Sequence, residues 1–111
     1  MAVANDESKR RIVGMLGFAM RAGKLILGTE LVCRAMPTGR VKLAVISSTA
    51  SDGTVKKLRT KSEFYNIPSV TVDIGTEELG GLLGKTHPTA AVAVTDDGFA
   101  KEIMKATSVS Q

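Results

Sequence analysis

The apolar positions of this 111-residue chain alternate between a helical and a strand period. In the first segment, residues 6–22, apolar residues recur three or four positions apart, which predicts an amphipathic helix that ends at Gly23. Gly14 and Gly17 lie inside this helix and weaken it by up to about 1 kcal/mol each, so we expect them at a close contact with a neighbouring element. The predicted buried face consists of Ile12, Leu16, Ala19 and Met20.

Short apolar runs separated by more polar helical segments continue to the end of the chain. The runs of strand length and composition are 25–27, 41–46, 68–72 and 89–94. Helical spacing predicts helices over 29–36, 52–66 and 76–83, and a last one capped by Asp96 or Asp97. Because strands and helices alternate, we expect an α/β fold, a three-layer α/β/α sandwich with a central sheet. The runs 41–46 and 89–94 are apolar on both faces, which predicts buried central strands.

Composition favours a single domain. A chain of this length buries roughly two-thirds of its unfolded surface, and a hydrophobic fraction of 43% is enough for a core. Aromatic residues make up only 4% of the chain, so the core must consist of Val, Leu, Ile, Ala and Met. We expect residues 1–111 to form one domain, with frayed tails at 1–5 and 107–111.

The lone cysteine and the short apolar runs indicate the compartment. One cysteine excludes an internal disulfide and fits a reducing cytoplasm. No apolar run approaches the length of about 18 residues that a membrane-spanning helix needs. The N-terminal residues also lack the apolar segment of a secretion signal. We therefore expect a cytoplasmic monomer with no membrane partner.

Basic residues are concentrated in the first part of the chain. Residues 1–61 hold 12 of the 15 Lys and Arg residues but 4 of the 11 Asp and Glu residues, a local balance of +8. Residues 62–111 have a balance of −4. This asymmetry favours one basic face for a polyanion such as a nucleic acid. The alternative is a set of solvated helix surfaces, which is our interpretation of the run Lys56, Lys57, Arg59 and Lys61.

The segment from Arg21 to Gly39 carries the clearest binding signal. Gly28 lies between a predicted strand and a predicted helix, where backbone N–H groups can approach an anion closely. Thr29 is predicted to cap that helix by accepting a bond from its first amides. Lys24 precedes this junction and Arg34 follows it, about one helical turn beyond. For both basic residues a phosphate contact and a merely solvated position remain open.

The candidate catalytic and metal-binding patterns lack either the required spacing or the required number of residues. Gly84-Lys85-Thr86 resembles the end of a P-loop, but that pattern requires a glycine where Leu79 stands, and a preceding strand. His87, the only histidine, lies in a predicted loop, and Cys33 is expected to be a small core residue. One histidine and one cysteine cannot form the usual zinc ligand set. We therefore expect no enzyme activity, no catalytic residue, no metal and no cofactor.

Several longer segments together carry a family resemblance. They are L-G-F-A-M-R-A-G-K-L-I-L-G-T-E-L-V-C-R-A (16–35), K-L-A-V-I-S-S-T-A-S (42–51), Y-N-I-P-S-V-T-V (65–72), E-E-L-G-G-L-L-G-K (77–85) and A-A-V-A-V-T-D-D-G-F-A-K (90–101). Over residues 9–105 the chain resembles the L7Ae/L30e ribosomal-protein superfamily, most closely its bacterial YlxQ-like branch. The resemblance implies an L30e-like α/β/α sandwich with a mixed four-stranded sheet. It also implies RNA binding, commonly to kink-turns, through the start of the second helix and the loop after the last strand.

The resemblance can be carried over position by position. Gly28 matches the family glycine whose backbone approaches RNA, and Arg34 stands where kink-turn binders keep a lysine. Glu30 and Leu31 occupy the positions of an Asn-Glu pair that reads sheared G·A base pairs. Leu31 cannot form those hydrogen bonds, and Glu30 lacks the amide donor, so its simpler role is to complement the helix dipole. These departures predict weak kink-turn recognition, whereas phosphate contacts do not require the pair.

The resemblance assigns the loop after the last strand to the same site, although this loop is more acidic here than in kink-turn binders. The expected function is non-catalytic RNA binding, with ribosomal RNA or a kink-turn as the structured partner and with a link to the ribosome or translation. The alternative is a protein-interaction module of the same fold whose RNA site has degenerated. The candidate RNA-binding residues are Lys24, Gly28, Thr29, Glu30, Leu31, Arg34, Val94, Thr95 and Asp96.

Overall fold

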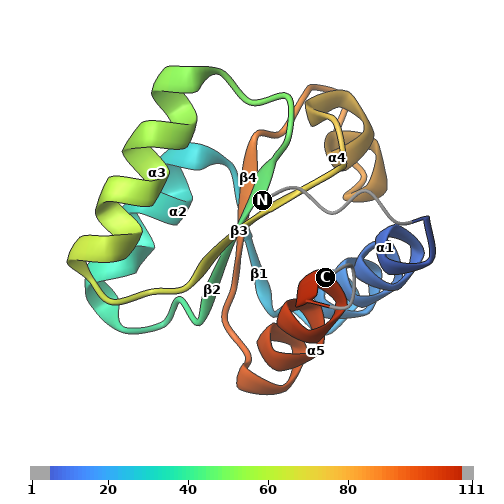
Figure 1. Cartoon of the computed structure of the whole chain (residues 1–111), viewed down its shortest axis with the longest axis horizontal. Coiled ribbons are helices and arrows are strands. Elements are labelled where there is room, and N and C mark those ends of the chain that lie inside the picture. The colour runs from blue at the N-terminus through green and yellow to red at the C-terminus, as the bar shows by residue number, and fades with distance from the viewer. Residues whose placement is uncertain (1–5, 109–111) are drawn as a thin grey trace.

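A central mixed sheet with helices on both faces organises the chain (Figure 1). The computed structural model describes residues 6–108. Its sheet has the order β1-β4-β2-β3, in which β4 is antiparallel to both of its neighbours and β2 is parallel to β3. The predicted central strands are therefore confirmed as β2 and β4. The strands are β1 (Leu25–Leu27), β2 (Leu43–Ser47), β3 (Ser69–Val72) and β4 (Ala91–Val94).

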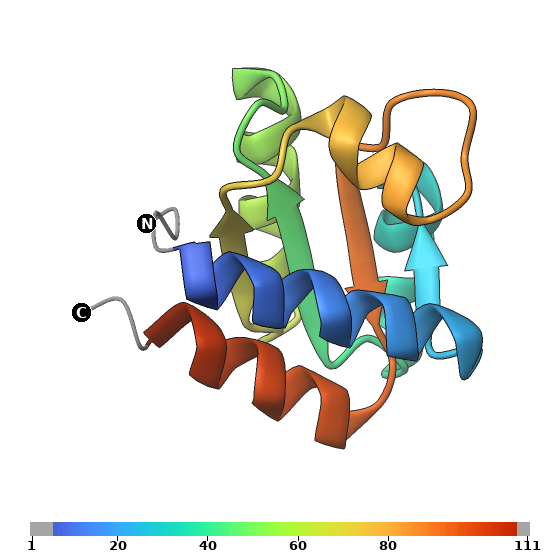
Figure 2. The same ribbon diagram turned by 90° about the vertical axis from the view of Figure 1, so that its right-hand side faces the viewer.

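The helices form the two outer layers of the predicted α/β/α sandwich. One layer holds α1 (Asp6–Arg21) and α5 (Asp97–Ser108), which lie side by side in Figure 2, with α4 (Thr76–Leu82) beside them. The other layer holds α2 (Thr29–Ala35) and α3 (Asp52–Phe64), on the far side of the sheet in that view. A short 3-10 turn, η1, extends α2.

Alternate residues of the central strands divide the core between these layers, because side chains along a strand point to opposite faces. Every residue of β2 and β4 is buried, as expected for strands covered on both sides. The side toward α2 and α3 is lined largely by alanines of the strands, whose small side chains let these helices approach the sheet. Leu43, Val45, Val92 and Val94 contact the layer of α1, α4 and α5, and Ala44, Ile46, Ala91 and Ala93 contact the layer of α2 and α3.

Two expectations about α1 are wrong. Met20 is 36% exposed and lies outside the buried face, whose apolar residues are Ile12, Leu16 and Ala19. Gly14 and Gly17 do not lie at a close contact, since a Cβ at Gly14 would have no other heavy atom within 4 Å and one at Gly17 would meet only the tip of an arginine side chain at 3.9 Å. The helical period explains both results, because these residues lie at the margin of the buried stripe or outside it.

At the other end of the chain, α5 begins and ends in defined hydrogen bonds. The Asp96 carboxylate accepts a bond from the N–H of Phe99 at 2.9 Å, which confirms the predicted cap. The helix continues to Ser108, and the Thr107 hydroxyl donates to the Met104 carbonyl at 2.7 Å. The expected tail therefore does not begin at 107. Its remainder, residues 109–111, and the expected tail 1–5 lie outside the described residues.

Candidate nucleic-acid interface

The junction between β1 and α2 is built around Gly28. Its φ of 95° lies in the region that favours glycine. Its N–H donates to the Ala91 carbonyl at 3.0 Å, which ties the junction to the start of β4, and its carbonyl accepts the first bond of α2 from Val32 at 3.0 Å. A Cβ at this position would have no heavy atom within 4 Å. The backbone at Gly28 is therefore open to the approach of a ligand.

The predicted capping role of Thr29 is wrong. Gly28 is the N-cap residue of α2, Thr29 is already the first helical residue, and no side chain caps the helix. The positive φ at the junction explains the shift, because a glycine can take that conformation and leave Thr29 in the helix. The amides of the first turn have no acceptor within the helix. They remain available to a group outside the helix.

Strand β1 separates the predicted site residues into two groups. The N–H and the hydroxyl of Thr95 both donate to the carbonyl of Lys24, at 2.9 Å and 3.1 Å, so these two residues and Asp96 lie at the start of the strand. Gly28 follows its last residue. At about 3.3 Å per residue, Lys24 and Gly28 are about 13 Å apart. The candidates therefore do not form one patch.

The residues at and after the end of β4 are buried or form hydrogen bonds within the protein. Val94 is fully buried, and its carbonyl accepts a bond from Lys42 at 2.8 Å, so its side chain cannot reach a ligand. The expectation that Val94 lines the RNA site is wrong, because β4 is a central strand covered on both faces. The hydroxyl of Thr95 and the carboxylate of Asp96 are used in hydrogen bonds to Lys24 and to the start of α5.

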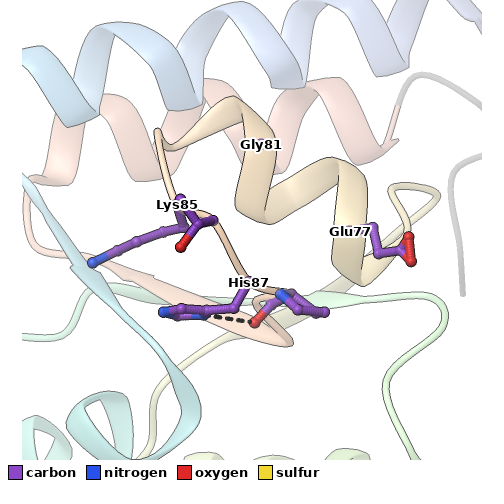
Figure 3. Close-up of a pocket in the computed structure, with 6 residues that line it drawn as sticks. Glu77, Gly81, Lys85 and His87 are labelled. Carbon is purple, nitrogen blue, oxygen red and sulfur yellow. Dashed lines mark hydrogen bonds between the residues drawn. The ribbon is translucent and has the colours of Figure 1, made fainter.

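The segment that does lie beside Gly28 is the loop leading into β4. Because β1 and β4 are antiparallel, residues 84–90 approach the Gly28 end of β1, and Figure 2 shows this orange loop arching above the tip of β1. Exposed Lys85 and His87 line a cavity of about 380 Å³ with Glu77 and Gly81 of α4. In Figure 3 the side chains of Lys85 and His87 point toward the pale blue ribbon of β1 and α2, and the side chain of Glu77 points away from it.

Gly80 fixes this loop against α4. A Cβ at Gly80 would overlap the carbonyl oxygen of His87, so this position admits only glycine without a shift of the loop. The N–H of Lys85 donates to the Gly80 carbonyl at 2.9 Å, and that of Thr89 donates to Thr76 at 2.9 Å. No residue of this loop was among those predicted for the RNA site. The only sequence feature that marks this loop is Gly80-Gly81 followed by Lys85. These residues do not form a P-loop, and they do not reveal which strand the loop lies beside.

The exposed side of α2 carries the remaining candidates. Leu31 is 53% exposed, and Glu30 and Arg34 are exposed as well. Cys33 is buried, which confirms the expected small core residue. Glu30, Cys33 and Arg34 border a groove of about 340 Å³ whose opposite wall is formed by Lys57 and Lys61 of α3. Part of the basic run that we interpreted as a solvated face therefore borders a groove.

The cations of this groove are not paired within the part of the chain that the structure describes. Lys9 pairs with Glu78 at 3.2 Å and Lys105 with Glu102 at 3.7 Å, and neither pair involves a cation of the groove. Over the same residues, no cluster of three or more His, Cys, Asp or Glu side chains could hold a metal ion. No helix within 6–108 has the length and apolar character needed to cross a membrane.

Comparison with known proteins agrees with this architecture. Residues 10–104 match the model of the ribosomal protein L7Ae/L30e/S12e/Gadd45 family. The chain is 33% identical over 98 residues to the RNA-binding protein YlxQ of Enterococcus faecium, covering 88% of this chain and 92% of that relative. It is 37% identical over 90 residues to the protein of the same name from Bacillus subtilis, covering 81% and 88%. The large ribosomal subunit protein eL30 of Sulfolobus acidocaldarius is 35% identical over 88 residues, covering 79% and 85%.

Solved structures show the same fold. A Bacillus halodurans protein of unknown function superimposes with a TM-score of 0.81 at 35% identity, covering 88% of this chain and 97% of that one. A 15.5kD RNA-binding protein of Giardia lamblia superimposes with a TM-score of 0.78, covering 96% and 90%. Its identity of 16% makes this second likeness one of fold alone.

Proposed function

The chain belongs to the ribosomal protein L7Ae/L30e/S12e/Gadd45 family, and from this premise we propose that it binds structured RNA. Relatives at 33% and 37% identity carry the name RNA-binding protein, and one at 35% is a ribosomal protein. The observation that carries the proposal is the open backbone of Gly28, which has a positive φ, no side chain and no close neighbour where a Cβ would lie. A phosphate or ribose can approach such a backbone directly.

The proposed RNA surface combines the Gly28 junction with the loop before β4. Lys85 supplies positive charge on the loop side, and Arg34 supplies it further along α2. Contacts of this kind go to the phosphate backbone, which positions an RNA without reading its sequence. Lys24, Thr95 and Asp96 lie outside this surface, at the other end of β1.

We propose that a kink-turn, if bound, is held mainly through its backbone. Glu30 offers only acceptor oxygens and Leu31 offers no polar atom, so neither can reproduce an Asn-Glu pair at sheared G·A base pairs.

The proposed setting is the cytoplasm, where the protein acts as a monomer on ribosomal or other structured RNA. Its action there involves no catalytic step and no cofactor.

One observation favours a second candidate function. The exposed apolar side chain of Leu31 stands next to the junction, as it would on a protein-interaction module that has lost its RNA site. Capture of partners from a lysate, with and without nuclease treatment, separates the two. Loss of the captured material after nuclease treatment supports RNA binding, and unchanged capture supports the protein-interaction module.

The RNA surface is tested by removing its two cations. Arg34→Ala combined with Lys85→Ala should weaken binding of a kink-turn hairpin and reduce the slope of log affinity against log salt by about 0.7–0.9 for each phosphate that is no longer neutralised. The control is Lys101→Ala combined with Lys105→Ala, which removes the same charge from α5 on the opposite layer. Equal affinity and slope for wild type and the Arg34/Lys85 variant would contradict the proposed surface.

A further inference from the structure

The groove between α2 and α3 is a basic surface that adjoins the proposed RNA surface and shares Arg34 with it. Arg34 lies on one wall, Lys57 and Lys61 lie on the other, and Glu30 is the acidic residue that borders it. None of these three cations is in an ion pair within the described part of the chain. With three cations and one carboxylate along its walls, the groove has a positive balance. A polyanion is the partner that this charge fits.

An exposed aromatic ring continues the same face of α3. Lys57, Lys61 and Phe64 are spaced four and three residues apart, which places them along one side of the helix over about 10 Å. Phe64 is 76% exposed, the most exposed of the large apolar side chains described. Its ring and the ring of Tyr65 form a T-shaped pair, with the centroids 4.9 Å apart and the planes at 85°. Tyr65 packs in turn against the core on this side of the sheet, so it helps to hold the Phe64 ring at the end of the groove.

The direction of the helices connects this groove to the Gly28 junction. β1 and β2 point the same way because both are antiparallel to β4, and α2 and α3 follow them on the same face of the sheet (Figure 1). Both helices therefore run from the Gly28 end of the sheet toward its other end. A strand leaving the junction along the groove would pass the lysines before it reaches Phe64.

Resting on the RNA binding proposed above, we propose that the α2/α3 groove binds a single-stranded extension of the bound RNA. Its phosphates contact Arg34, Lys57 and Lys61, and an unpaired base stacks on Phe64. Basic grooves that end in an exposed aromatic ring suit single strands, because every base has a face that can stack and the backbone supplies the charge. A base inside a duplex is already stacked on both faces, and an acidic peptide has charge but no nucleobase to stack on the ring.

The test compares a kink-turn hairpin with the same hairpin carrying a single-stranded oligouridine tail. Wild type should bind the tailed RNA more tightly than the hairpin. Lys57→Ala combined with Lys61→Ala should abolish this gain and lower the salt slope for the tailed RNA by about 0.7 for each phosphate that is no longer neutralised. Phe64→Leu should weaken binding of the tailed RNA roughly 5- to 100-fold. Both variants should bind the untailed hairpin as wild type does.

Matched controls remove similar groups from the other helical layer. Lys101→Ala with Lys105→Ala removes the same charge from α5, and Phe18→Leu replaces an aromatic ring that is 54% exposed on α1. These variants should retain the gain from the tail. Circular dichroism and urea midpoints equal to those of wild type show that the groove variants are folded.

Each other result overturns the proposal in a distinguishable way. If wild type binds neither RNA, the proposed RNA binding itself fails, and the groove proposal fails with it. If the hairpin is bound but the tail adds nothing, or the groove variants keep the gain, only the groove proposal fails. An equal decrease in affinity for both RNAs would assign the groove to the duplex backbone. Displacement of the tail by polyglutamate as effectively as by free oligouridine would indicate an acidic protein partner.

Discussion

At the scale of single residues, the proposed site depends on glycines for two different reasons. Gly28 is needed for its backbone conformation, since its φ is positive and the space around it is open. Gly80 is needed for space, since the His87 carbonyl occupies the position of a Cβ. The first glycine leaves the backbone open for the proposed RNA contact, and the second holds the loop before β4 in place. A substitution at Gly80 therefore displaces the loop side of the proposed RNA surface and leaves the Gly28 backbone unchanged.

We expect Gly80→Ala to displace the loop before β4 and to destabilise the protein by about 1–3 kcal/mol, the usual range for overpacking. Its neighbour provides the control, because a Cβ at Gly81 would have no heavy atom within 4 Å. Gly81→Ala should be neutral or should stabilise α4 by up to about 1 kcal/mol. Urea denaturation measures both effects. Equal midpoints for the two variants would contradict the packing role of Gly80.

A double substitution tests the prediction that residues 30 and 31 of α2 form no hydrogen bonds to the bases of a kink-turn. Glu30→Asn combined with Leu31→Glu should increase affinity for a standard kink-turn, because polar groups return where wild type can form no such hydrogen bonds. The gain should disappear for the same RNA with its G·A pairs replaced by Watson–Crick pairs. If the double variant binds the kink-turn no better than wild type, the RNA does not use this turn of α2 in the expected way.

At the scale of secondary-structure elements, most of the fold could be predicted and most of the site could not. The apolar runs identified β2 and β4 because buried central strands must be apolar on both faces. The site required knowledge of pairing. Only the antiparallel register of β1 and β4 brings the loop before β4 to Gly28 and leaves Thr95 beside Lys24. Periodicity identifies each strand but contains no information about its neighbour, so it could not show that the loop carrying Lys85 lies beside Gly28.

Helix α1 offers a paired test at this scale. Gly14 is exposed inside the helix and has open space around it, so Gly14→Ala should stabilise the protein by about 0.5–1 kcal/mol. Gly23 ends the helix with a φ of 71°, so Gly23→Ala should destabilise it by about 1–2 kcal/mol. Thermal and urea unfolding measure both effects. A decrease in the stability of Gly14→Ala would indicate a close contact that this structure does not contain.

At the scale of the whole molecule, the two ends of the sheet have different roles. At one end, Lys24, Thr95 and Asp96 hold β1, β4 and α5 together through hydrogen bonds. At the other end, Gly28 and the loop carrying Lys85 and His87 present an open backbone and a positive charge. The concentration of basic residues before position 62 adds the groove between α2 and α3 to this second surface. RNA is therefore expected at one end of the sheet and along one helical layer.

Amide chemical-shift mapping with a kink-turn hairpin tests this central claim most directly. The account predicts that the largest changes occur at Gly28–Leu31 and Lys85–His87, two segments far apart in the sequence that meet only in the fold. The amides of Lys24, Thr95 and Asp97 should change little. Changes concentrated at those three residues, or an absence of changes at saturating RNA, would contradict the proposed RNA surface.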